Sequence, residues 1–260
     1  MKFFEFGKEN EKSLFILCGY LAKWSPGLMP FISEASKKYH VIVQAYDGFN
    51  ENEKEKCFNS IVREAEYAAD YIYENLNAYV DILYGISMGG MVANEIIMDK
   101  RIKVHTFIAD GYTILPMPKF KNSFIQNLYV KGYSNLIYSV LTKHQGFLAK
   151  LLGRTKESIS ESLYTDVSKE TIRNSVISEI GYRYKYESFN YTDSYVFHGT
   201  AERVAAAKVH KLKKDGINFT HKMFRNVGHG GLIHMNPRKL LNLIDKAYKG
   251  ELRAESKPKD

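Results

Sequence analysis

The feature that most constrains the fold is the stretch of residues 80–93, in which an apolar run passes through a glycine-rich turn into a second apolar run. Strand-forming residues precede the turn, and after it apolar side chains recur at helical spacing. Ser87 stands between Gly85 and Gly89 in the pattern G-x-S-x-G. Glycines at these positions permit a sharp bend and a close backbone approach that a Cβ would obstruct. The stretch therefore predicts a strand, a tight turn and a helix, with Ser87 at the apex.

Strand and helix patterns alternate on both sides of this turn. Strands are expected over residues 2–6, 13–18, 41–45, 79–84, 104–109, 194–198 and 218–224, and helices over residues 27–38, 51–76, 88–101, 204–214 and 237–248. Because helices connect successive strands, right-handed crossovers and a largely parallel sheet are expected. The fully apolar second and third strands indicate a sheet that is covered on both faces. The fold class predicted is α/β.

The alternation stops between residues 113 and 191, where aromatic-rich helical patterns divided by glycines replace the strands. Pro116 and Pro118 mark the beginning of this segment. We interpret residues 113–191 as an inserted helical cap, and residues 1–112 together with 192–260 as one core domain. The alternative is that these helices simply cover the sheet. The charged residues from Gly250 onward are expected to be frayed.

Composition narrows the class of protein further. A chain of 260 residues that is 45% hydrophobic is long enough for one large domain with an insertion. Its formal charge of +8 comes from lysines spread along the sequence without a nucleic-acid motif, so we expect a solvated basic surface and no nucleic-acid partner. No run reaches the roughly 18 apolar residues of a membrane span. Glu5 and Lys8 interrupt the first apolar residues, which predicts no secretory signal and a cytoplasmic location.

The chain contains two cysteines, Cys18 in an expected strand and Cys57 on an expected helix. Two cysteines exclude a disulfide scaffold and give no support to a Cys/His zinc site. We expect both side chains to be buried thiols.

Two later loops offer partners for Ser87. A serine hydroxyl needs an adjacent base to act as a nucleophile at neutral pH, and that base needs an orienting group. His229 lies in a glycine-rich loop after the last expected strand and is the predicted general base. Glu202, in the loop after the preceding strand, is the predicted orienting acid, and Asp110, at the end of an earlier strand, is the alternative. Glu202 is favoured because its loop, G-T-A-E-R-V, precedes a helix in the order serine, acid, histidine.

Two backbone N–H groups would be needed to hold a tetrahedral oxyanion. Met88 directly follows Ser87 at a helix N-terminus and is expected to supply one of them. The loop after the second strand is expected to supply the other from Tyr20, with Leu21 as the alternative.

Three further residues receive less specific interpretations. His198 stands at a strand end beside a glycine and is interpreted as a structural histidine. His234 is a weak substitute for His229 as the base. Trp24 could line a pocket, and a buried packing role is equally compatible with its position.

Taken together, these motifs resemble the α/β-hydrolase fold superfamily, in its capped, esterase-like form. The resemblance covers nearly the whole chain and depends on G-I-S-M-G at the elbow, C-G-Y at the oxyanion loop, Y-D-G-F-N at an early turn, H-G-T-A-E-R-V at the acid loop and G-H-G at the base. Two positions depart from the family pattern: Cys18 replaces a histidine that often precedes the oxyanion glycine, and Glu202 stands where most members have aspartate. Ser87 at the elbow argues against the haloalkane dehalogenases and epoxide hydrolases, which use aspartate there.

The resemblance implies a serine hydrolase that cleaves a small or medium carboxylic ester or thioester through an acyl-serine intermediate. The aromatic cap suggests a small-molecule acyl substrate with an apolar moiety. The same triad could instead serve an acyltransferase, a C–C hydrolase or a peptidase, and a ligand-binding protein could retain the fold without turnover. No cofactor is implied, because an acyl-serine route needs neither a metal nor a nucleotide.

Overall fold

The computed structural model describes residues 2–49, 56–111, 120–147 and 156–255. Seven strands form one sheet: β1 (Lys2–Phe6), β2 (Ser13–Leu17), β3 (His40–Ala45), β4 (Tyr79–Ile86), β5 (Lys103–Asp110), β6 (Asp193–Gly199) and β7 (Thr220–Phe224). Their order across the sheet is β1-β3-β2-β4-β5-β6-β7. All neighbours are parallel except β1, which pairs antiparallel with β3. The predicted α/β architecture with a largely parallel sheet is confirmed.

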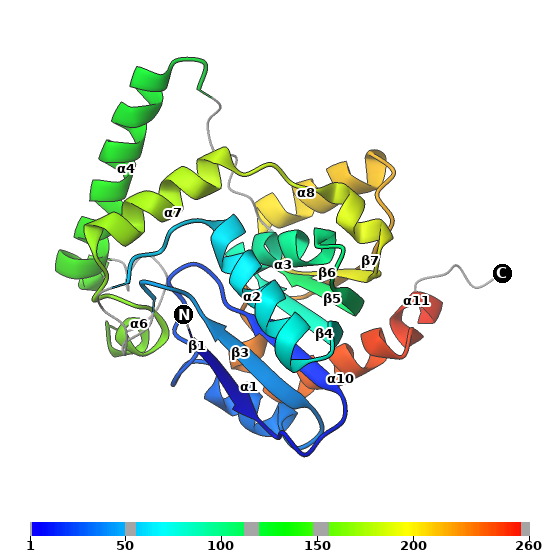
Figure 1. The fold of residues 1–260 in the computed structure, drawn as a ribbon. Coiled ribbons are helices and arrows are strands. Elements are labelled where there is room, and N and C mark those ends of the chain that lie inside the picture. The colour runs from blue at the N-terminus through cyan, green and yellow to red at the C-terminus, as the bar shows by residue number, and fades with distance from the viewer. Residues whose placement is uncertain (1, 50–55, 112–119, 148–155, 256–260) are drawn as a thin grey trace.

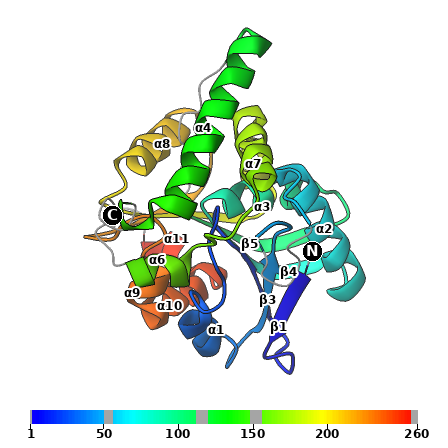
Figure 2. The same cartoon turned by 90° about the vertical axis from the view of Figure 1, so that its left-hand side faces the viewer.

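Helices cover both faces of this sheet. The helices that connect or follow its strands are α1 (Met29–Ala35), α2 (Ile61–Asn75), α3 (Met88–Met98), α8 (Arg203–Lys214), α9 (Leu232–Met235), α10 (Pro237–Tyr248) and α11 (Glu251–Glu255). Helices α2 and α3 pack together on one face, and α1 packs with α10 on the other (Figures 1 and 2). Every residue of β2 is buried, as its continuous apolar sequence predicts.

The segment between β5 and β6 is helical, as its aromatic patterns predict. It contains α4 (Ser123–Lys143), α6 (Lys156–Ser162), α7 (Lys169–Gly181) and a 3₁₀ helix (Tyr186–Asn190). Helices α4 and α7 pack side by side and lie outside the sheet (Figures 1 and 2). The proposed entry prolines, Pro116 and Pro118, lie outside the described residues. The division into a core and a cap at residues 113 and 191 stays a prediction.

Helix α2 begins later than the sequence pattern predicts. We expected a helix over residues 51–76, but α2 starts at Ile61, and residues 50–55 lie outside the described part of the chain. Ser60 ends the preceding extended chain, and its hydroxyl oxygen accepts a hydrogen bond from the backbone N–H of Arg63 at 3.1 Å. A serine that caps a helix in this way fixes the start of the helix. Apolar spacing upstream of the cap therefore misled the prediction.

The later start of α2 also changes the prediction for Cys57. This cysteine lies in irregular chain before the helix and is only partly buried, whereas Cys18 is buried as predicted. The Cys57 Sγ lies 3.6 Å from the hydroxyl oxygen of Ser168, at the start of α7. The prediction of two buried thiols on regular elements is therefore wrong for Cys57.

The end of the described chain is more ordered than expected. We predicted frayed residues from Gly250 onward, but residues 251–255 form α11. Leu252 is buried within the main hydrophobic core, which gives this short helix an apolar contact to hold it. Residues 256–260 lie outside the described part of the chain.

Candidate active site

Ser87 lies at a sharp junction between β4 and α3, as predicted. Its backbone has φ 53° and ψ −115°, a conformation that non-glycine residues rarely adopt and that costs about 1–3 kcal/mol. The Ser87 N–H donates a hydrogen bond to the Asp110 carbonyl oxygen at 2.9 Å, which anchors the turn to the neighbouring strand. Ser87 remains partly exposed although residues on both sides of it are buried. This geometry presents the serine at the carboxyl end of the sheet.

The two glycines that flank Ser87 are required by close backbone contacts. A Cβ on Gly85 would lie 2.7 Å from the Gly89 carbonyl oxygen, and a Cβ on Gly89 would lie 2.2 Å from the Leu17 carbonyl oxygen. Both distances are too short for any side chain. The G-x-S-x-G spacing in the sequence therefore has a steric cause: it lets α3 approach β2 while the chain reverses direction.

Glu202 and His229 form a hydrogen-bonded pair. The Nδ1 of His229 lies 2.7 Å from Oε2 of Glu202, and the other carboxylate oxygen of Glu202 accepts the Gly199 N–H at 2.8 Å. The Glu202 side chain is 5% exposed and that of His229 is 48% exposed. The carboxylate is thus held in place from two directions, while the imidazole it contacts still reaches the surface.

Backbone contacts bring His229 to the same edge of the sheet as Ser87. A Cβ on Gly111 would lie 2.9 Å from both Cε1 and Nδ1 of the His229 ring. Gly111 directly follows Asp110, whose carbonyl oxygen accepts the Ser87 N–H. In addition, a Cβ on Gly230 would lie 3.1 Å from the side chain of Ile86, the residue before Ser87. The loop that carries His229 therefore packs against the chain next to the serine.

The contact with Glu202 changes the pKa of His229. Partial burial alone lowers the pKa of His229, but the hydrogen bond and negative charge of Glu202, with a further contribution from Asp110, outweigh burial and raise this pKa above its usual value. The imidazolium is therefore favoured relative to a solvated histidine. A base whose protonated form is stabilised in this way accepts a proton more readily.

Asp110, the alternative acid, occupies a different environment. It is buried, and its Oδ2 accepts a hydrogen bond from the hydroxyl of Tyr84. Burial raises the pKa of Asp110 to about 6. Among the contacts of the described residues, the imidazole Nδ1 of His229 is hydrogen-bonded to Glu202 and not to Asp110. The geometry thus favours Glu202 as the partner of His229.

The loop after β2 lies against Ser87. A Cβ on Gly19 would lie 3.4 Å from the Cβ of Ser87, so the next residue, Tyr20, begins close to the serine. The side chain of Tyr20 turns toward α7, where its hydroxyl lies 3.0 Å from the Ser175 Oγ. Met88 is buried at the first position of α3. The two predicted oxyanion donors therefore come from segments on either side of Ser87, and their role stays a prediction.

Of the other residues considered from sequence, His198 is buried, Trp24 is partly buried and His234 is exposed. His198 is buried, with its Nδ1 2.9 Å from the Gly199 carbonyl oxygen, and its ring stacks on that of His221 at 4.8 Å. The Nδ1 of His234 lies 3.2 Å from the Gly27 carbonyl oxygen. The ring of Trp24 packs against Phe4, with centroids 4.3 Å apart. Trp24 thus packs against β1, in agreement with the packing role among its two interpretations.

Sequence reasoning missed two residues that shape this region. Tyr84 donates to Asp110 from the neighbouring strand, and Gly111, at φ 60°, leaves room for the His229 ring. The dipeptide Asp110-Gly111 is itself a turn signal that could have drawn attention to Gly111. For Tyr84 the sequence carries no signal, because the contact depends on the register of β4 against β5.

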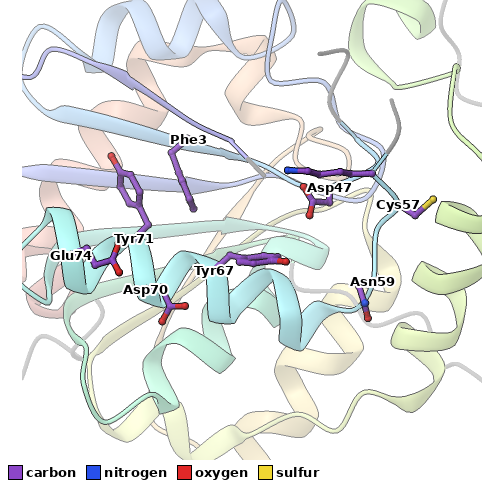
Figure 3. Close-up of a pocket in the computed structure, with 9 residues that line it drawn as sticks. Phe3, Asp47, Cys57, Asn59, Tyr67, Asp70, Tyr71 and Glu74 are labelled. Atoms are coloured by element: carbon purple, nitrogen blue, oxygen red, sulfur yellow. The ribbon is translucent and has the colours of Figure 1, made fainter. Parts of the chain in front are cut away.

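A separate cavity of about 580 Å³ lies between β1 and α2 (Figure 3). Its lining is aromatic and polar, and it includes Phe3, Tyr71 and Asp70. None of the predicted site residues lines it. Asp70 already forms an ion pair with Arg101 at 2.9 Å. This cavity is therefore distinct from the region around Ser87.

Two further properties concern metals and membranes. Within the described ranges, no group of three or more histidine, cysteine or carboxylate side chains is arranged to hold a metal ion. None of the helices in the described part of the chain has the length and apolar character needed to cross a bilayer.

Solved structures with the same fold include several hydrolases. No protein-family model matches the chain, and no curated protein matches its sequence. MenH from S. aureus is similar with a TM-score of 0.73 at 16% identity, covering 96% of this chain and 98% of that one. A thermophilic esterase from Thermogutta terrifontis has a TM-score of 0.71 at 15% identity, covering 96% and 93%. An esterase from Exiguobacterium antarcticum has a TM-score of 0.68 at 17% identity, covering 95% and 94%.

These matches span nearly the whole length of both partners in each comparison. The sheet order, the turn at Ser87 and the structural likeness agree with one another. The protein therefore has the α/β-hydrolase fold, as the sequence resemblance predicted.

Proposed function

We propose that this protein is a serine hydrolase that cleaves a small or medium carboxylic ester or thioester through an acyl-serine intermediate. The observation that carries the proposal is the 2.7 Å contact between His229 Nδ1 and Glu202 Oε2, at the edge of the sheet where Ser87 occupies a strained turn. Esterases among the structural neighbours support the same class of reaction.

In the first half of the proposed reaction, Ser87 Oγ attacks the carbonyl carbon of the substrate. The Nε2 of His229 accepts the hydroxyl proton, and the carboxylate of Glu202 stabilises the resulting imidazolium. The substrate oxygen becomes an oxyanion, which the N–H groups of Met88 and Tyr20 would hold. The imidazolium then donates its proton to the leaving alkoxide or thiolate as the carbonyl–leaving-group bond breaks, which yields the acyl-serine.

In the second half, water replaces the leaving group. His229 takes a proton from the water as its oxygen attacks the acyl carbon, and the same oxyanion donors serve again. The proton returns to Ser87 Oγ when the acyl bond breaks, which releases the carboxylic acid and restores the free serine. Apart from the substrate and water, every step uses side-chain and backbone groups of this chain.

The proposed substrate is a small molecule with an apolar acyl group, because the helices between β5 and β6 are rich in apolar and aromatic side chains. Acyl transfer, C–C bond hydrolysis and peptide hydrolysis would use the same three residues with another acceptor or scissile bond. Product analysis separates these reactions. A ligand-binding protein without turnover would show none of them.

A fluorophosphonate probe and a series of p-nitrophenyl esters of increasing chain length test the proposal. We expect the probe to label Ser87 in the folded protein, and we expect Ser87→Ala to lose labelling and to lower kcat by roughly 10⁴-fold or more. Ser33→Ala, at an exposed serine on α1, is the matched control and should behave as wild type. Absence of both labelling and ester turnover in folded wild-type protein would refute the proposal.

A further inference from the structure

Among the described residues, helix α4 makes packing contacts on one side only. Val130 lies in a small buried cluster with Val176 and Ile180 of α7. The side chains on the opposite side of α4 are large, apolar and exposed to solvent: Phe124 (74%), Ile125 (53%), Leu128 (63%) and Leu136 (59%). At 3.6 residues per turn these four positions fall within an arc of about 120°. We call them the exposed face of α4.

Within the described parts of the chain, the exposed face of α4 is left open to solvent. Gly132 lies in the middle of it, and a Cβ at that position would meet no atom within 4 Å. In both views the first turns of α4 project past α7 and away from the sheet (Figures 1 and 2). A contiguous apolar face that projects into solvent is costly to expose and marks a site of interaction.

The sequence around α4 carries positive charge but no negative charge. Between Asp110 and Glu157 the sequence contains no acidic residue, but it contains seven basic ones: Lys119, Lys121, Lys131, Lys143, Lys150, Arg154 and Lys156. Helical spacing places Lys131 just outside one edge of the exposed face and Lys143 within its arc, two turns beyond Leu136, and both lysines are exposed. No ion pair recorded among the described residues includes either of them. Apolar side chains with exposed lysines on the same side of the helix favour an anionic, apolar partner.

We propose that the exposed face of α4 docks the protein on an anionic lipid surface. A helix that lies in the headgroup region buries its apolar side chains among the acyl chains, while lysines beside them extend to the lipid phosphates. Each lysine near an anionic bilayer adds about a fivefold gain in affinity. A second copy of this chain is a poorer partner, because it would bring another acid-free, basic segment against the first.

The docking proposal does not depend on the chemistry proposed for Ser87. The exposed face consists of α4 residues, none of which we have placed in the catalytic machinery. A loss of ester hydrolysis and a loss of lipid binding are therefore separate measurements on separate variants. Ser87→Ala should bind lipid as wild type does.

Flotation of the purified full chain with vesicles tests the apolar part of the proposal. We expect binding to vesicles that contain phosphatidylglycerol, and weak binding to vesicles of phosphatidylcholine alone. The double variant Phe124→Ser/Leu128→Ser should bind the anionic vesicles roughly tenfold more weakly or worse, since two large side chains no longer transfer from water. Met223→Ser, at an exposed methionine on β7, should bind as wild type does.

A charge-reversal pair tests where the lysines act. Lys131→Glu/Lys143→Glu should weaken binding to the anionic vesicles by roughly tenfold or more. Lys100→Glu/Lys103→Glu changes the net charge equally at exposed positions just before and at the start of β5, the opposite end of the strand from the segment that leads to α4, and it should weaken binding much less. Far-ultraviolet circular dichroism verifies that each variant is folded.

Three results would overturn the proposal. Wild-type protein that fails to bind phosphatidylglycerol vesicles would do so, and so would equal weakening by the two charge-reversal pairs. The third is a wild-type dimer in sedimentation that Phe124→Ser/Leu128→Ser dissociates without any vesicle binding. That result would assign the exposed face to a second copy of the chain.

Discussion

Helices α3 and α4 are both rich in apolar residues, but they use them in opposite ways. Helix α3 buries nearly all of its side chains between the sheet and α2, and Ile96 is among its fully buried residues. Helix α4 buries one side against α7 and leaves Phe124 and Leu128 in solvent. The helix that begins beside Ser87 is therefore held by packing on nearly all sides, whereas α4 has an exposed apolar face that is available to a partner.

The contrast separates two uses of an apolar side chain. In α3 the side chains stabilise the fold, and the fold in turn holds a strained serine in position. In α4 the exposed side chains contribute little to folding, so their presence needs another explanation. Substitutions in the two regions should accordingly differ in kind: those around α3 alter chemistry and stability, and those on the exposed face of α4 alter neither.

In this comparison, the largest effect is expected at Glu202, whose carboxylate is hydrogen-bonded to His229. Glu202→Gln keeps the size of the side chain but removes the charge that orients His229, and we expect kcat for an ester substrate to fall by roughly 10²- to 10⁴-fold. Asp110→Asn is the matched control, because its carboxylate contacts Tyr84 and not the imidazole Nδ1. It should cost less than roughly tenfold. A larger loss for Asp110→Asn than for Glu202→Gln would reverse the assignment of the acid.

The same substitution in the two helices gives a direct comparison of stability. Ile96→Ala removes a fully buried side chain of α3 and should lower the free energy of unfolding by about 2–5 kcal/mol. Ile125→Ala removes an exposed side chain of α4 and should lower it by less than about 0.5 kcal/mol. Urea denaturation of both variants measures the two values. Similar losses in the two helices would show that α4 is covered in solution.

The dependence of activity on pH gives a smaller effect with a defined sign. His229 must be neutral to accept the serine proton, so kcat/KM should fall as pH drops through its pKa, which lies above the usual value of about 6.5. Glu202→Gln removes the main contribution that raises this pKa, and its residual activity should persist to lower pH. A pH profile of ester hydrolysis measures the shift. An unchanged acidic limb in Glu202→Gln would separate Glu202 from the titration of His229.

Local sequence patterns were sufficient to predict the turn at Ser87 and the edge of the sheet at which the candidate site residues lie. The glycines around Ser87 have no room for a Cβ, so the local pattern indicates a tight turn. The loops that carry Glu202 and His229 follow parallel strands, whose carboxyl ends lie at the same edge of the sheet. These predictions depend on features a few residues long. The contact between His229 and Gly111 joins positions far apart in the chain, and no local pattern encodes it.

The sequence predictions were weakest where burial had to be inferred from apolar periodicity. The apolar periodicity of α2 begins before the helix does, because Phe58 is buried in the core although it lies in irregular chain. In α4 the periodicity identifies the helix correctly but does not reveal which apolar side is covered. Apolar periodicity identifies an apolar face of a helix, but only the tertiary structure shows what packs against that face.

The strained backbone conformation of Ser87 means that the residue lowers the stability of the fold. A glycine at φ 53° would avoid the strain that a serine bears there. Ser87→Gly should therefore raise the free energy of unfolding by roughly 1 kcal/mol and unfold at a higher temperature than wild type. The thermal unfolding midpoint measures this difference. Selection for heat resistance alone would then discard the residue on which the proposed chemistry depends, and only selection for turnover would retain it.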